Sequence, residues 1–461
     1  MVHTKKLNSM QIFTIIWAGQ LVSLLGSRMT RFALMIWAYE QAGSATTLAL
    51  IGFFAWVPYI VLSPVAGVWV DRLDRRWVLI LSDVGSGVLT LLVIGLFQTG
   101  SLAIWHIYLL EAASSLFDAF QGPAYMAATS TLLPKASYGR ANGMRSLAQD
   151  GTMILAPIIA GALLPLIGIG GIMLIDVATF LVAVFTLGVI HLPIAPGNSE
   201  TINNPAFGEE LRFGFRYIFT RKGLLGLMVL FMGIEFFATL TYFSVMPALI
   251  LARTGGDERA LGIVQATLGA AGVVGGLLMS IFGLPKRKIH AVCGLCAISF
   301  LCGDFLFAIG RTLPHWLIAS AVAAVFIPFI SGANRTIWQT KVAPHFQGRV
   351  LAVSNMFTSA PKPFAYLLAG PIADRWLGPA MQPNGALAPS FGWLVGTGPG
   401  AGIGLMFVGT AILGALMSLS GYLFRAVRHV EDELPDYDVE DRDEPALLLA
   451  APVPINGEIA G

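Results

Sequence analysis

Apolar runs long enough to cross a lipid bilayer recur along the whole chain, and this repetition limits the fold more than any other feature. A transmembrane helix needs about 20 apolar residues, each adding about 1.5 Å of length. Runs of this kind lie near 11–38, 47–70, 77–98, 102–131, 145–167, 169–190, 223–251, 260–283, 289–310, 314–340, 350–376 and 401–424. The sequence therefore predicts an all-α polytopic membrane protein with twelve transmembrane helices.

The composition agrees with a membrane protein and excludes several other classes. Hydrophobic residues make up 56% of the chain and charged residues only 12%, whereas about a quarter of the residues in soluble proteins are charged. The basic residues are scattered through short loops and form no dense stripe, so we expect no nucleic-acid partner. Cys293, Cys296 and Cys302 lie in one apolar run, without the further Cys or His ligands that a zinc site needs. We therefore expect no metal and no cofactor.

The basic residues of the loops predict the orientation in the membrane. If the N-terminus is cytoplasmic, most of them fall in cytoplasmic loops, and the opposite loops hold only Arg253, Arg259, Arg311 and Arg375. Basic residues resist translocation, so both termini are predicted to be cytoplasmic. We expect a monomeric, multi-pass protein of the cell membrane whose partners are the lipid bilayer, a small-molecule substrate and protons.

The longest cytoplasmic connection divides the predicted helices into six and six. Its second part, FGEELRFGFRYIF, places Phe207, Leu211, Phe215 and Ile218 on one helical face, which predicts a helix lying at the membrane surface. We expect a six-helix bundle at 1–190, a linker with this helix at 191–222, a second six-helix bundle at 223–428, and an acidic, disordered cytoplasmic tail at 429–461.

A shift of 209 residues aligns the two halves of the chain. It carries Phe117–Gly122 onto Phe326–Ser331, Gly139-Arg140 onto Gly348-Arg349, and Gly67 onto Gly276. One offset that holds at several places predicts two parallel copies of a six-helix unit. In transporters built in this way, the substrate binds between the bundles near the middle of the membrane, and rocking of one bundle against the other alternates its access.

The stretch GVWVDRLDRRWV places five charges between two apolar runs. Gly67, Asp71, Arg72, Arg75 and Arg76 in this stretch resemble motif A of the major facilitator superfamily, with Asp74 in place of the usual second glycine. The resemblance implies that Asp71 meets the positive N-terminal end of segment 11 and forms a conformational latch with Arg72. The alternative is a charged loop that only sets the topology.

Other stretches resemble the drug:proton antiporter branch of that superfamily. In LAPIIAGAL, Pro157 and Gly161 are similar to the core of the antiporter motif, and FDAFQGPAYMAATSTLLP, GRANGMRSL and LLGSRMTRFAL look like macrolide-efflux and enterobactin-exporter-like proteins. Many of these antiporters carry an arginine four residues before the glycine of a QG pair, where this chain has Asp118. Their scheme of proton coupling therefore does not transfer to that position.

Ionisable residues deep in the predicted helices are the candidates for the transport site, because each costs at least about 2.5 kcal/mol in the membrane. The resemblance implies that segments 1, 4, 7 and 10 line the central cavity. Those segments hold Arg28, Arg31, Glu111, Asp118, Glu235 and Arg335, and Lys362 lies between two prolines in segment 11. Glu235 and Asp118 are the leading candidates for binding a proton or a cation, since a buried carboxylate can alternate between its protonated and ionised forms.

Several of these residues have a second interpretation. Arg28 or Arg31 could form a buried ion pair with Glu111 or attract an anionic substrate group, and Lys362 could pair with a carboxylate instead of facing the cavity. Three other acids are expected outside the substrate site. Asp83 is placed in a charge network at the cytoplasmic ends of the helices, and Asp176 and Asp304 are placed at the periphery of the bundles.

The predicted function is proton-coupled efflux of amphipathic small molecules, such as macrolide drugs, by alternating access. The chain contains no GxxxxGK[ST] loop for nucleotide binding, and we expect neither an ATP-driven pump nor an enzyme. The alternatives are a dedicated siderophore or metabolite exporter, a lysolipid transporter, and a non-transporting scaffold. The scaffold would tolerate Glu235→Gln and Asp118→Asn with no loss beyond stability.

Overall fold

The computed structural model describes residues 8–134, 137–189, 207–343, 346–434 and 436, and these residues form helices and turns without a strand. Nine helical stretches among them are long and apolar enough to cross a membrane. One stretch holds two spans, and α4 (Ile104–Leu132) and the pair α15 (Gln347–Ser359) and α16 (Lys362–Pro371) supply two more. The predicted all-α fold with twelve membrane segments is confirmed.

The N-terminal bundle contains long helices with few breaks. Its other helices are α1 (Ser9–Ala42), α2 (Ala45–Arg72), α3 (Arg75–Gln98) and α5 (Tyr138–Val189). Within α5, Gly168 has φ 67° and ψ 178°, a conformation that glycine adopts without strain. Trp17 Nε1 donates to the Met144 carbonyl oxygen at 2.7 Å, and a Cβ added to Gly19 would lie 2.5 Å from Thr186 Oγ1. Both ends of α5 therefore lie beside the same part of α1, so the chain reverses at Gly168.

The spans of the C-terminal bundle are more often interrupted. Prolines explain part of this, because proline has no N–H to donate, and Pro361 and Pro363 lie where α15 gives way to α16. Other interruptions are short π-helical segments. The elements are α7 (Lys222–Ala238), η2 (Thr239–Phe243), α8 (Met246–Thr254), α9 (Glu258–Phe282), α10 (Lys288–His290), η3 (Ala291–Leu295), α11 (Cys296–Ile298), η4 (Ser299–Asp304), α12 (Phe305–Ile309), α13 (Leu313–Val325), α14 (Ile327–Lys341), η6 (Ile372–Leu377), α17 (Gly378–Ala380) and α19 (Ala401–Leu423).

The helix boundaries repeat with the offset found in the sequence. The fourth span begins at Ile104 in the first half and at Leu313 in the second, and it ends at Leu132 and at Lys341. The fifth begins at Tyr138 and at Gln347. Each pair is separated by 209 residues, so the duplication predicted from side chains is also present in the backbone.

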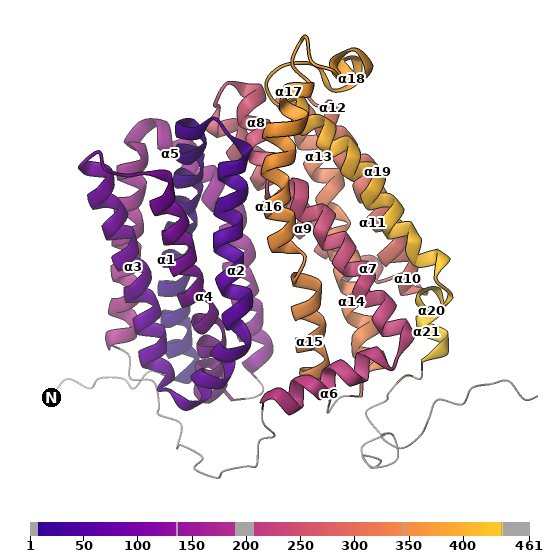
Figure 1. Ribbon diagram of the computed structural model, residues 1–461. Helices are drawn as coiled ribbons and strands as arrows, with labels where there is room; N and C mark the ends of the chain where they lie inside the picture. Colours follow the sequence, from indigo (N-terminus) through magenta and orange to yellow (C-terminus); the bar gives the residue numbers. More distant parts are fainter. Residues whose placement is uncertain (1–7, 135–136, 190–206, 344–345, 435, 437–461) are drawn as a thin grey trace, which may run out of the picture.

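Two short helices mark the opposite ends of the molecule. Figure 1 shows the two bundles side by side, with α6 (Phe207–Phe219) crossing one end of the C-terminal bundle and α18 (Ala388–Val395) at the other. We call these the α6 end and the α18 end. Apolar residues of both bundles share one core, which includes Ala45 and Leu48 of α2 with Ala365 and Ala369 of α16.

The apolar face of α6 packs against protein. Ile218 is fully buried, and the rings of Phe215 and Phe357 meet edge to face with their centres 5.0 Å apart. A Cβ on Gly214 would lie 2.9 Å from the Arg349 carbonyl oxygen, so α6 touches the α15 backbone. The segment predicted to rest in the membrane surface thus also closes the core of the C-terminal bundle.

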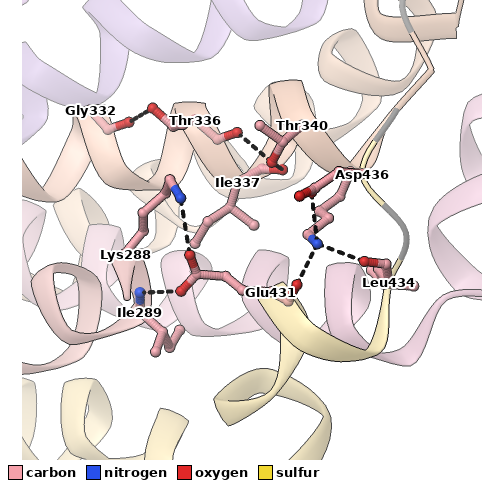
Figure 2. Close-up of polar contacts among 10 residues, drawn as sticks. Lys288, Ile289, Gly332, Thr336, Ile337, Thr340, Glu431, Leu434 and Asp436 are labelled. Atoms are coloured by element: carbon pink, nitrogen blue, oxygen red, sulfur yellow. Dashed lines mark hydrogen bonds and ion pairs between the residues drawn. The ribbon is translucent and has the colours of Figure 1, made fainter. Parts of the chain in front are cut away.

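The first residues of the acidic tail form a short helix. We expect disorder from residue 429 onward, but α21 (Val430–Glu433) follows α20 (Arg425–Arg428) and docks at the α6 end. As Figure 2 shows, Glu431 accepts from Lys288 Nζ at 3.2 Å and from the Ile289 backbone nitrogen at 3.0 Å. The Lys341 ammonium donates to the Glu431 carbonyl and lies 2.8 Å from Asp436 Oδ1. Residues 437–461 of the predicted tail lie outside the described residues.

Candidate transport site

A cavity of about 390 Å³ lies inside the N-terminal bundle. Its lining comes from α1 to α5 and runs along α1 from Trp17 to Leu34. Four carboxyl groups face three guanidinium groups along it: Asp83, Glu111, Asp118 and Asp176 with Arg28, Arg31 and Arg145. The structure thus brings together all four of the candidates predicted from segments 1 and 4.

Arg31 joins the two acidic candidates of segment 4. Its Nη2 lies 2.9 Å from Asp118 Oδ2, and its Nε lies 3.8 Å from Glu111 Oε2. The Glu111 side chain is 6% exposed, whereas those of Arg31 and Asp118 are 44% and 41% exposed. Asp118 and Arg31 therefore face the cavity, while Glu111 lies behind them as a buried counter-charge. The contact between Arg31 and Glu111 agrees with the second interpretation of these residues, a buried ion pair.

Arg28 lies one helical turn from Arg31 and has neutral partners. Its guanidinium donates to the carbonyl oxygen of Gln149 at 2.9 Å and to the Gln149 Oε1 at 3.0 Å. Because neither partner is charged, the charge of Arg28 is less compensated than that of Arg31.

Asp83 is a cavity residue that the sequence does not assign to the substrate site. It is 5% exposed and accepts from the amide nitrogens of Gln20 and Gln121, both at 2.6 Å. Glutamines in the middle of apolar helices are the sequence signal for such a buried polar group. Asp83 thus belongs to the cavity wall and forms no ion pair among the residues that the structure describes.

Asp176 corrects a second expectation. We expect it at the periphery, but it is 3% exposed and lines the cavity. Its carboxylate accepts from Ser27 Oγ at 2.9 Å and from Thr90 Oγ1 at 3.1 Å. The close approach of α1 and α5 explains this placement, since a Cβ on Gly26 would lie 3.0 Å from the Asp176 Cα.

Glu235 and Lys362 form an ion pair in the C-terminal bundle, outside the 390 Å³ cavity. Lys362 Nζ lies 3.1 Å from Glu235 Oε2 and 4.5 Å from the centre of the Trp56 ring. Trp56 belongs to α2, so Lys362 contacts both bundles. Arg335 lies on α14 with an exposed side chain and does not line the cavity. The predicted residues of segments 1 and 4 therefore do not share one cavity with those of segments 7 and 10.

Helices α5 and α9 approach closely where the two bundles meet. A Cβ on Gly262 would lie 2.5 Å from the Pro157 carbonyl oxygen, and one on Gly161 would lie 3.1 Å from the Glu258 carbonyl oxygen. The two residues of the antiporter-like motif thus contact the opposite bundle. Only glycine at position 262 permits this distance between the backbones.

A carboxylate of the C-terminal bundle caps a helix of the N-terminal bundle. Asp374 in η6 accepts from the backbone nitrogens of Ala45 and Thr46 at 3.1 and 2.7 Å, and from the hydroxyls of Ser44 and Thr46 at 2.9 and 2.6 Å. These groups form the N-terminus of α2, whose free N–H groups and positive dipole end favour an anion. The contact joins the bundles at the α18 end.

The family follows from comparison with known proteins. The sequence pattern of the Major Facilitator Superfamily matches residues 16–365. The chain belongs to the major facilitator superfamily. Macrolide efflux protein A of Streptococcus pyogenes is 27% identical over 372 residues, which cover 79% of this chain and 89% of that protein. The multidrug efflux pump Tap of Mycobacterium tuberculosis is 24% identical over 374 residues, with 78% and 87% covered.

A solved structure supports the same fold. The nucleoside transporter NupG superposes with a TM-score of 0.70 at 12% identity, covering 90% of this chain and 100% of that one. At this identity the likeness extends to the fold alone. The predicted superfamily is confirmed, and the protein is a membrane transporter and not an enzyme.

The motif A residues of this major facilitator protein are described in part. Gly67, Asp71 and Arg72 belong to α2 and Arg75 begins α3, but the surroundings of their side chains lie outside the described residues. Asp74 caps α3 by accepting from the Arg76 backbone nitrogen at 2.9 Å. Arg76 Nη2 donates to the Gly188 carbonyl oxygen at 2.9 Å, near the negative C-terminal end of α5.

Proposed function

We propose that the protein is a proton-coupled exporter of amphipathic, cationic small molecules, with macrolides as the first class to test. The observation that carries this proposal is the charged cavity of the N-terminal bundle. Its volume of about 390 Å³ lies within the range of about 300 to 1,000 Å³ typical of drug-sized sites. Macrolide efflux protein A and the pump Tap, which this chain resembles along most of its length, support the direction of transport.

The charges of the cavity favour a cationic substrate. Four carboxyl groups outnumber three guanidinium groups along its lining, and the exposed carboxylate of Asp118 is the group that an amine could reach. Such an amine would compete with Arg31 for Asp118. Glu111 would then keep Arg31 compensated, because both carboxylates contact the same guanidinium.

The ion pair between Glu235 and Lys362 is the coupling switch in this proposal. Glu235 is 34% exposed, so a proton can reach it, and its carboxylate holds Lys362 beside Trp56 of the opposite bundle. Protonation of Glu235 removes the charge that attracts Lys362. The contact of Lys362 with α2 would then weaken. Proton binding to Glu235 would in this way change how the two bundles pack against each other.

The structure is consistent with the state in which the cytoplasmic side is open, if the α6 end is the cytoplasmic one as the loop charges predict. The contacts of Asp374 with Thr46, Lys362 with Trp56 and Gly262 with Pro157 each lie in the half of the helices nearer the α18 end. The cavity lining runs along α1 from Leu34 to Trp17, and Trp17 is near the α6 end. A substrate would then enter from the cytoplasm and leave past the α18 end.

Uptake into inside-out membrane vesicles tests this function. We expect erythromycin and a cationic dye such as ethidium to accumulate when the vesicle interior is acidified, and a protonophore to stop the accumulation. Continued uptake after the gradient is collapsed would rule out proton coupling. Transport of a siderophore alone, with no drug accepted, would instead favour the dedicated exporter.

Glu235→Gln separates binding from coupling. We expect the variant to bind erythromycin within about threefold of the native affinity, because Glu235 lies outside the cavity lining, and to lose gradient-driven accumulation. Glu258→Gln is the matched control, since Glu258 lies on the neighbouring span at the α18 end and forms no ion pair in the described part of the chain. A Glu235→Gln protein that still accumulates drug would contradict the switch.

A further inference from the structure

Asp304 is a carboxyl group enclosed in the C-terminal bundle. It ends the π-helical segment η4, and its side chain has no solvent exposure. Its Oδ2 accepts from Thr410 Oγ1 of α19 at 2.5 Å, and its Oδ1 has no hydrogen-bond partner among the described residues. The sequence places Asp304 at the periphery, so the structure corrects that expectation.

A second buried oxygen without a partner lies next to it. The Tyr242 hydroxyl is 3.0 Å from the position of a Cβ on Gly303, the residue before Asp304, and it is near enough to interact with the Asp304 carboxyl group. Neither Tyr242 Oη nor Asp304 Oδ1 makes a hydrogen bond of good geometry among the described residues. The Tyr242 ring meets the rings of Phe307 and Phe407 edge to face, with centres 5.5 and 5.6 Å apart. Besides Thr410, Asp304 thus has the Tyr242 hydroxyl as a polar neighbour in otherwise aromatic surroundings.

The side chains around Asp304 supply no compensating cation. Cys296 of α11 and Tyr242 of η2 are the titratable neighbours that interact with it electrostatically. The guanidinium of Arg253 donates to the carbonyl oxygens of Ala308, Gly310 and Val395 instead. The remaining titratable side chains on the elements that pack against η4, and on η4 itself, are Cys302, His315 and Tyr422. Asp304 therefore makes no ion pair among the described residues.

A proton satisfies this site better than a metal ion does. A metal cation such as Ca²⁺ takes about six to eight oxygen ligands, whereas the nearby oxygens are those of Asp304, Thr410 and Tyr242. An ionised carboxylate with no cation in an apolar interior is strongly disfavoured, and a neutral acid is tolerated when it is hydrogen-bonded. Orphaned buried oxygens and π-helical turns both recur at functional sites.

We propose that Asp304 is a second proton-binding site of the transport cycle, in addition to the Glu235 switch. This inference rests on the proposed function and deepens it by raising the number of coupled protons. Asp304 holds its proton as a carboxylic acid in the present state. When α19 and η2 separate during the cycle, water reaches Oδ1, the O–H bond breaks, the proton passes to water, and the carboxylate remains until it is reprotonated from the opposite side.

Drug accumulation at a fixed pH difference measures the number of protons. With the membrane potential clamped and a difference of one pH unit, each coupled proton adds about a factor of ten to the accumulation ratio. We expect Asp304→Asn to lower the erythromycin ratio in inside-out vesicles about tenfold without changing binding. Ser320→Ala removes a buried hydroxyl of the same bundle that has no hydrogen-bond partner among the described residues, and it should leave the ratio unchanged. An unchanged ratio in Asp304→Asn overturns the inference.

The outcomes for the two proposals differ. If accumulation by the native protein ignores a protonophore, the proposed function itself fails. If the native protein is proton-driven and Asp304→Asn accumulates drug equally well, only the second proton site fails.

Infrared difference spectroscopy of the purified protein tests the proton directly and needs no transport. The native protein at neutral pH should show the C=O band of a protonated carboxylic acid that Asp304→Asn lacks. Thr410→Val keeps the carboxyl group, and we expect it to shift that band because Oδ2 loses its hydrogen bond. If Asp304→Asn does not fold, the band shift in Thr410→Val identifies the band as that of Asp304. A band that does not change when erythromycin binds would mark a permanently protonated acid and overturn the inference.

Discussion

The two ends of the molecule are held together in different ways. At the α18 end the contacts cross from one bundle to the other, as Asp374 does with the N-terminus of α2 and as Gly262 does with Pro157. At the α6 end, the contacts of α6 and α21 stay within the C-terminal bundle, as Glu431 does with Lys288 and Lys341. The contacts at the α18 end thus affect how the two bundles pack against each other, whereas those at the α6 end stabilise the C-terminal bundle alone.

In the proposed cycle of alternating access, this difference has the following consequences. Contacts that cross between bundles exist in one state and must break in the other, so they set the ratio of the two states. The contacts of α6 and α21 lie within the C-terminal bundle, and we expect them to be present in both states. Substitutions in the contacts that cross between the bundles at the α18 end should therefore change the conformational ratio, whereas substitutions in the contacts of α6 and α21 should change stability alone.

The largest effect is expected at Gly262. A valine there would place its Cβ 2.5 Å from the Pro157 carbonyl oxygen, and overpacking of this kind costs about 2 kcal/mol, or about thirtyfold in the ratio of closed to open protein. Spin labels at the exposed positions Gln41 and Arg259 report the opening of the α18 end. Gly272→Val is the matched control on α9, because an added Cβ there meets nothing within 4 Å. Equal spectra for the two variants would refute the contact.

A smaller shift is expected at Asp374. Replacing it with alanine removes four hydrogen bonds to the start of α2, and loss of a helix cap costs about 1.4 kcal/mol, or tenfold in the same ratio. Asp257→Ala removes the cap of α9, which stays within one bundle. It should lower stability without opening the α18 end. If both variants open it equally, the contact across the bundles has no special role.

The smallest effect is expected at the docked tail. Lys341 is buried, and its ammonium donates to the carbonyl oxygens of Glu431 and Leu434. It also pairs with Asp436, so Lys341→Met should cost about 1 kcal/mol of stability. The thermal melting temperature of the purified protein measures this loss. The distance between labels at Gln41 and Arg259 should not change. A change in that distance would show that the tail also controls the relation between the bundles.

Local patterns in the sequence predict much of this architecture. Apolar runs predict the spans because helix length and hydropathy are properties of contiguous residues. The 209-residue offset reappears in the bounds of α4 and of the span formed by α13 and α14. The resemblance in motif A and in the antiporter motif predicts the superfamily, which the family comparison confirms. The prolines beside Lys362 mark the break between α15 and α16.

The surroundings of individual charges depend on which helices are neighbours, and a single sequence does not contain that information. Asp176 and Asp304 both look peripheral from their segments, yet one lines the cavity and the other is enclosed by aromatic rings. Glu235 is found beside Lys362 and outside the cavity that contains Asp118. The sequence also does not predict the contacts of Glu431, because an acidic composition by itself favours disorder.

Paired distance measurements test the central claim of alternating access most directly. Labels at Gln41 and Arg259 span the α18 end, and labels at Arg140 and Lys286 span the α6 end, all at exposed positions in a protein whose three cysteines are replaced. On acidification with erythromycin present, we expect the first distance to increase while the second decreases. Distances that change in the same direction, or that do not change, would contradict the account.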